Sequence, residues 1–167
     1  MRRSMAVTLA AACCAVPASA RAQTATSGTP QSLFTHQLET DRGTAADIRA
    51  ALRAKRVFVD DDITFSDLTG DGRQDAVVRV DSGGAGGTIA VYVFSTDGAS
   101  KLRAVYRNQR LYRAVATING TTLLINTPRY APGDEVCCAA QMLERSLTWS
   151  ASGKRMVVRS TRVTSVT

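Results

Sequence analysis

The sequence has no internal repeat, only one histidine, and no long apolar run after its first residues. Because it has no repeats, it cannot supply the several blades that a β-propeller needs. Because no later stretch approaches about 20 apolar residues, none is expected to cross a bilayer as a helix. After residue 22 only two cysteines remain, Cys137 and Cys138, so at most one intramolecular disulfide bond is available to this part of the chain.

Residues 1–22 have the pattern of a secretory signal peptide. Two arginines precede an apolar run over residues 5–15, and small residues follow Pro17. A positive start, a short apolar segment and a site of the A-x-A kind are typical of such signals. We therefore predict export to the periplasm or beyond the cell, with cleavage after Ala20 or Ala22.

The alternative for this end of the chain is a lipid anchor at Cys13. Three alanines precede Cys13, and the leucine that a lipobox prefers lies one residue too far upstream, at Leu9. We therefore expect no lipid anchor at Cys13. The polar residues 23–32 indicate a flexible lead, and residues 33–167 have a suitable length for a single β-rich domain.

The hydrophobic pattern predicts an α+β domain. Residues 44–55 repeat apolar side chains at helical spacing, and Thr44 is the expected N-cap. The segments that follow alternate apolar and polar residues, or are apolar on both faces as in residues 89–94, and tight turns such as Asn119-Gly120 join them. We expect one antiparallel meandering β-sheet with one N-terminal helix packed on it.

The charges divide unevenly along the chain. Residues 23–100 hold seven basic and eleven acidic side chains, whereas residues 101–167 hold eleven basic and three acidic ones. The basic residues are mostly single arginines spaced along predicted strands, without the dense run and interleaved aromatics of a nucleic-acid binder. We expect a solvated sheet face there and no nucleic-acid partner.

Residues 67–75 form the most specific chemical pattern, a loop with oxygen-bearing side chains at alternate positions. Calcium takes six to eight oxygen ligands, and a tightly wound loop can turn alternate residues inward. Gly72 stands at the sixth position, where the turn favours a residue without Cβ. The predicted ligands are the side chains of Asp67, Thr69, Asp71 and Asp75 and the backbone carbonyl of Arg73. Val78 stands where an EF-hand needs glutamate, so strands are expected to flank the loop.

Residues 65–78 resemble the calcium loops of FG-GAP and VCBS-type repeats, in which a D-x-[DNT]-x-D-G-x-x-D loop precedes an apolar strand. This resemblance implies a structural calcium ion in a β-sheet surface module. Most of the chain is also similar in layout to small exported bacterial proteins, including the LppP/LprE-like lipoproteins. The shared features are the DLTGDGRQDAVV, IAVYVF and PGDEVCC segments and a strand that ends at Trp149. The second resemblance implies a fold and an exported location, not an activity.

Export favours oxidation of Cys137 and Cys138. Adjacent Cα atoms lie about 3.8 Å apart across a trans peptide, less than the usual separation of about 4.4–6.8 Å in a disulfide. A vicinal bridge would therefore be strained, and a vicinal disulfide, two free thiols and an intermolecular bridge all remain open. Metal binding would need further ligands, and the single histidine, His36, is far away in the sequence.

The sequence contains no clear set of catalytic residues, although His36 and one of the two cysteines are a conceivable nucleophilic pair. We expect a non-enzymatic exported domain with one structural calcium ion, acting as a binding or envelope-associated module for an unidentified protein or envelope partner. The first alternative is an inhibitor or ligand-binding protein whose basic strands, with Arg103, Arg107 and Arg113, engage an acidic partner. The second is a thiol redox protein that uses Cys137 and Cys138.

Overall fold

The computed structural model describes residues 28–96 and 101–166. Two helices come first, α1 (Pro30–Thr40) and α2 (Ala46–Arg53). The strands are β1 (Phe58–Val59), β2 (Thr64–Ser66), β3 (Asp75–Asp81), β4 (Thr88–Thr96), β5 (Leu102–Asn108), β6 (Val115–Asn119), β7 (Thr122–Arg129), β8 (Gln141–Ser150) and β9 (Arg155–Ser165). The predicted signal peptide, its cleavage site and the lipid-anchor question at Cys13 lie outside the described residues.

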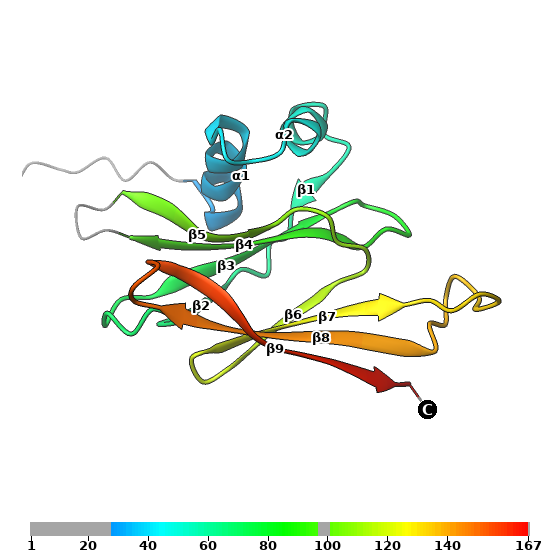
Figure 1. The fold of residues 1–167 in the computed structure, drawn as a ribbon. Coiled ribbons are helices and arrows are strands. Elements are labelled where there is room, and N and C mark those ends of the chain that lie inside the picture. The colour runs from blue at the N-terminus through cyan, green and yellow to red at the C-terminus, as the bar shows by residue number, and fades with distance from the viewer. Residues whose placement is uncertain (1–27, 97–100, 167) are drawn as a thin grey trace, which may run out of the picture.

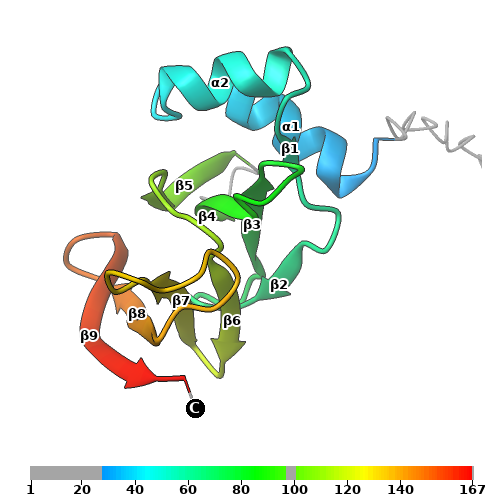
Figure 2. The same cartoon turned by 90° about the vertical axis from the view of Figure 1, so that its right-hand side faces the viewer.

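These elements form three layers (Figures 1 and 2). The helices cover one face of a first sheet, in which β3 and β4 lie in the middle, β1 and β2 both pair with β3, and β5 forms an edge. A second sheet, with the order β6-β7-β8-β9, packs against the other face. Every strand pair is antiparallel, as predicted. The number of layers differs from the prediction, because two helices and two sheets replace one of each.

Strands β3 and β4 are buried on both faces because they contribute to both cores. Val78 and Tyr92 lie in the core beneath the helices, whereas Val77 and Val93 lie in the core between the sheets. Consecutive side chains of a strand point to opposite faces, so a strand between two cores needs apolar residues at almost every position. This explains the apolar run over residues 89–94 and confirms its prediction as a central strand.

Helix α1 is the main element that the sequence analysis did not predict. Thr29 caps it by accepting a hydrogen bond from the amide of Ser32, and Pro30 begins it, a position that suits the fixed φ of proline. Phe34 and Leu38 are one turn apart and are its buried residues. Residues 30–32, predicted as the end of a flexible lead, are therefore the first turn of a helix. Within the described ranges, no helix has both the length and the apolar character that a membrane crossing requires.

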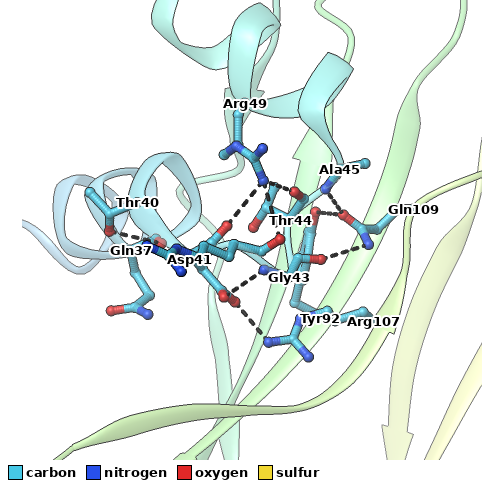
Figure 3. Close-up of polar contacts among 11 residues, drawn as sticks. Gln37, Thr40, Asp41, Gly43, Thr44, Ala45, Arg49, Tyr92, Arg107 and Gln109 are labelled. Atoms are coloured by element: carbon cyan, nitrogen blue, oxygen red, sulfur yellow. Dashed lines mark hydrogen bonds and ion pairs between the residues drawn. The ribbon is translucent and has the colours of Figure 1, made fainter.

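The start of α2 also differs from the prediction. Ala45 occupies the N-cap position and no side chain caps the helix there; the Thr44 hydroxyl is buried without a hydrogen-bond partner. The amide of Ala45 donates instead to Oε1 of Gln109, 2.5 Å away, at the end of β5. The same oxygen accepts from the Tyr92 hydroxyl at 2.9 Å (Figure 3). The predicted local cap is thus replaced by a partner 64 residues away.

The segment that joins the helices is held on the first sheet by Asp41. Its Oδ2 pairs with Nη2 of Arg107 at 2.8 Å, and its Oδ1 accepts from the amide of Gly43 (Figure 3). Burial raises the pKa of Asp41, but the hydrogen bonds from Arg107 and Gly43 outweigh it, so the net shift is downward. A Cβ at Gly43 would lie 2.7 Å from the Arg107 guanidinium, so a larger residue there would have to displace that side chain.

The turn between β6 and β7 is shifted by one residue from its prediction. Asn119 pairs with Thr122, so the two central residues are Gly120 and Thr121. Gly120 has a φ of 60°, and a glycine at the first central position is the pattern of a type II′ turn. Asn119 therefore remains in the strand, and the glycine alone supplies the positive φ.

Candidate functional site

The acidic loop, residues 67–74, joins β2 to β3 and is closed at its base by strand pairing. Ser66 pairs with Asp75 across the two strands, and Leu68 is buried in the core between the sheets. The loop is therefore flanked by strands, as the valine at position 78 predicted. Its base is fixed by the fold, while its tip at Asp71 and Gly72 is exposed.

The loop is wound around the carboxylate of Asp67. Oδ1 of Asp67 accepts from the amides of Gly70 and Asp71 at 2.7 and 3.1 Å, and Oδ2 accepts from the amide of Gly72 at 2.9 Å. Gly70 and Gly72 have φ angles of 73° and 80°, a region that L-residues rarely adopt. The expectation that Gly72 occupies a strained position is confirmed. A carboxylate offers about four lone-pair directions, so three amides leave Asp67 some capacity for a cation.

Asp75 is the buried member of the acidic loop's candidate ligands, with 0% of its surface exposed. Its Oδ2 accepts from the amides of Leu68 and Thr69 at 2.9 and 2.8 Å. Its Oδ1 is buried without a hydrogen-bond partner, and no ion pair of the described residues involves Asp75. A buried charge without a cation is costly. The Asp75 carboxylate therefore has unmet capacity for a positive partner.

The side chain of Asp71 interacts with Arg73 in this structure. Its Oδ2 pairs with Nη2 of Arg73 at 2.6 Å, and its Oδ1 accepts from the Arg73 amide. These bonds hold the pKa of Asp71 below its usual value. The Oγ1 atom of Thr69 is near Asp71 and lowers its pKa slightly. This oxygen is buried, and it makes no hydrogen bond of normal geometry with the described residues.

The five predicted calcium ligands are thus close in sequence but not gathered around one point. Among the described residues, the one group of three metal-ligating side chains whose donor atoms all lie within 4.8 Å of one another is elsewhere, at Glu135, Cys137 and Cys138. Two of the predicted ligand atoms, Asp75 Oδ1 and Thr69 Oγ1, are suited to bind a cation, because they are buried and have no hydrogen-bond partner among the described residues. The carboxylate of Asp67 instead accepts backbone amides, and that of Asp71 pairs with Arg73.

The second candidate site is the cysteine loop, residues 130–140, between β7 and β8. Cys137 and Cys138 are free and exposed in the structure. Sγ of Cys137 lies 3.5 Å from Oε2 of Glu135. Hydrogen bonds to Cys138 and to Glu135 raise the pKa of the Cys137 thiol, because they favour its protonated form. His36 lies on α1, in the layer on the far side of the first sheet (Figure 1), so the structure does not support a Cys–His pair.

The third candidate is a basic groove between the edge strands β5 and β9, which contact each other on one side of the molecule (Figure 2). It encloses about 620 Å³ and its described lining contains no acidic residue. Arg103 and Arg107 come from β5, Lys154 from the turn before β9, and Arg155 from the first position of β9. Arg103 donates to the carbonyl of Lys154 at 3.0 Å and so bridges the two sides.

The structure brings together only part of the predicted basic set. Arg103 and Arg107 lie in the basic groove, but Arg113 precedes β6 and lines a separate pocket beside the cysteine loop. Sequence reasoning missed Lys154 and Arg155, because they are about 50 residues from Arg103 and no local pattern links them. One local feature could have indicated them: they follow the Ser152-Gly153 turn, at the start of an edge strand.

The fold and these sites define a class: a three-layer β-rich domain with one acidic loop, one thiol-bearing loop and one basic groove. Comparison with protein-family models, with curated proteins and with solved structures found no match. The function must therefore be argued from the residues themselves, and the resemblances to FG-GAP or VCBS-type loops and to LppP/LprE-like proteins stay predictions.

Proposed function

We propose that this protein is an exported, non-enzymatic binding domain whose acidic loop holds one structural calcium ion. The observation that carries the calcium proposal is the buried Asp75 carboxylate, which has an unpartnered oxygen and no cationic partner among the described residues. Asp75 begins β3, so a cation at this oxygen would stabilise the start of a strand that contributes to both cores.

The hydrogen bonds of the acidic loop are compatible with this proposal. Asp67 already organises the tip by accepting three amides, and Thr69 adds a buried, unpartnered hydroxyl. Calcium would have to compete with Arg73 for Asp71. That cost is small, because an exposed ion pair contributes about 0–1 kcal/mol.

Thermal unfolding with and without calcium tests the proposal. Extracellular calcium modules bind with dissociation constants of about 10⁻⁴ to 10⁻³ M, so about 10 mM calcium should add roughly 1.4–2.7 kcal/mol of stability. For a domain of this size, we expect the melting temperature to be higher by about 4–10 °C in calcium than in a chelator.

The substitution Asp71→Asn gives this experiment its specificity. Asp71 is exposed and its side chain pairs only with Arg73, so the variant should match the parent in chelator within about 0.5 kcal/mol yet lose the calcium response. Asp61→Asn, an exposed aspartate outside the loop, should keep it. An identical melting temperature of the parent protein in calcium and in chelator would remove the ion from this account.

The basic groove supports a second candidate function, the binding of an acidic, extended protein segment. β5 and β9 are both terminal strands of their sheets, and a free strand edge can add an extended peptide through backbone hydrogen bonds. Four cationic side chains line the groove and attract a negative ligand. Arg107 is already paired with Asp41, which leaves Arg103, Lys154 and Arg155 as the main contacts.

A labelled oligoglutamate peptide is the probe for this candidate. The double variant Lys154→Glu, Arg155→Glu is expected to weaken binding at least about tenfold, roughly 1.4 kcal/mol, and binding by the parent should weaken with salt. The control variant Arg56→Glu, Arg129→Glu makes the same change in net charge at exposed sites outside the groove. Equal losses in both variants would indicate attraction to net charge and would count against the groove.

A further inference from the structure

The cysteine loop is held in one shape by several hydrogen bonds. Oδ2 of Asp134 accepts from the amides of Ala131 and Ala140, at 2.8 and 2.9 Å, and so ties the two ends of the loop together. The Cys138 amide donates to the carbonyl of Glu135 at 2.9 Å, which closes a turn over the two cysteines. The three potential ligands are therefore presented by a braced turn.

A residue outside the loop reinforces this geometry. Nη1 of Arg113, which precedes β6, donates to the carbonyl of Val136 and to the Tyr130 hydroxyl. The Tyr130 hydroxyl itself donates to the same Val136 carbonyl at 2.9 Å. Two side chains thus fix the peptide immediately before Cys137, which limits the positions that its sulfur can reach.

The donor atoms of this turn have the composition and spacing of a soft-metal site. One carboxylate oxygen of Glu135 and the sulfurs of Cys137 and Cys138 all lie within 4.8 Å of one another. Tetrahedral zinc, with metal–sulfur bonds of about 2.3 Å and metal–oxygen bonds of about 2.0–2.2 Å, separates its ligands by roughly 3.5–3.8 Å. Small rotations of exposed side chains close that difference.

The electrostatics of the turn also suit a divalent cation. Two thiolates and one carboxylate carry three negative charges, which a divalent ion reduces to one. The Arg113 guanidinium donates to the carbonyl of Val136, the residue before Cys137, so its positive charge lies beside the site and offsets the remaining charge. Because thiolates favour soft ions whereas calcium prefers oxygen, this site and the acidic loop would select different metals.

We propose that Glu135, Cys137 and Cys138 bind one thiophilic divalent cation of the zinc kind, with Arg113 as a positioning residue. Three protein ligands leave a fourth position open. A pocket of about 590 Å³ is lined by Arg113, Tyr130 and both cysteines, and it would give water or a small ligand access to the ion. The inference is independent of the calcium proposal.

Cobalt titration of the full-length chain provides the test. Cys13 and Cys14 are first replaced by serine in every protein, so that only Cys137 and Cys138 are thiols, and the protein is reduced. Thiolate-bound cobalt gives a sulfur-to-metal charge-transfer band near the ultraviolet, and tetrahedral coordination gives intense visible bands. We expect both bands to saturate at about one equivalent and to disappear when zinc is added.

Variants separate the roles of the ligands from those of the surroundings. Cys137→Ser or Cys138→Ser should abolish the charge-transfer band or weaken affinity at least about 100-fold, and Glu135→Gln should weaken it about tenfold while the sulfur band remains. Arg113→Gln, as a positioning change, should weaken affinity about 10-fold with unchanged band positions. Glu144→Gln is the matched control, since Glu144 is the next acid along the chain and pairs with Arg162.

Protection of the two thiols from oxidation is a second test of the proposal. Zinc-loaded protein should resist air oxidation and thiol alkylation, whereas metal-free protein should be modified. A vicinal disulfide that forms at the same rate with and without zinc would overturn the proposal. So would the absence of a sulfur charge-transfer band in the reduced parent protein. Loss of the calcium response alone, with cobalt binding intact, would leave this site supported and would refute only the acidic-loop proposal.

Discussion

Replacing Asp75 by alanine is expected to lower the free energy of unfolding by about 2–4 kcal/mol, even in the absence of calcium. Oδ2 of Asp75 accepts the amides of Leu68 and Thr69, and the side chain is fully buried. Alanine would leave two donors without a partner in a place where water cannot replace the carboxylate. Urea denaturation in chelator, followed by circular dichroism, measures this loss.

The substitution Asp75→Asn separates the structural role of the side chain from its charge. The amide oxygen of asparagine can accept the same two backbone amides, and the buried charge with its unpartnered Oδ1 is removed. In chelator we therefore expect asparagine to be within about 1 kcal/mol of the parent or slightly more stable. In calcium only the parent should gain stability. If asparagine and alanine destabilise equally in chelator, the hydrogen-bond explanation is wrong.

Replacing Phe94 by alanine is expected to cost about 3–5 kcal/mol. Phe94 is 1% exposed and lies in the core beneath the helices. Its ring centroid is 5.2 Å from that of Phe34 on α1 and 6.1 Å from that of Tyr92 on β4. The truncation would open a cavity between the helix layer and the first sheet, and it would remove aromatic contacts to both neighbours.

A loss of this size could unfold the protein, so Phe94→Leu is measured beside it, with an expected cost of about 1–2 kcal/mol. Phe65→Ala on β2 is the control, because Phe65 is 45% exposed; we expect it to cost less than about 1 kcal/mol. If Phe94→Ala and Phe65→Ala have similar effects in urea denaturation, packing of the helix layer on the first sheet contributes little to the free energy of unfolding.

The longer strands were predictable because each shows its pattern locally, whereas the two-residue β1 was not predicted. Residues 75–81 alternate and follow a polar loop, and β3 has those bounds; the two-faced apolar run of β4 indicated a central strand. α1 was missed because Gly28, Pro30 and polar residues lie at its start, although Thr29-Pro30 followed by Phe34 and Leu38 is the signature of a capped helix. The division into two sheets could not be predicted, since alternation identifies a buried face but not which sheet covers it.

The candidate sites show the same limit. The spacing of aspartates predicted a wound loop, and the amide bonds of Asp67 agree with it. The burial of Asp75 could not be predicted, because it depends on the packing of the second sheet against β3. The group of Glu135 with both cysteines is local in sequence. Its contact with Arg113 joins residues 23 positions apart, and no spacing rule predicts such a contact.

The outermost position of β9 has a consequence for how copies of this protein meet at high concentration. An eleven-residue strand at a sheet edge offers unpaired backbone groups on which a second molecule can assemble into a continuous ribbon. Arg155, Arg159 and Arg162 are spread along this strand and are exposed. Two such edges brought side by side would place like charges in contact, so the same arginines that give this half of the chain its positive charge also oppose the pairing of two β9 edges.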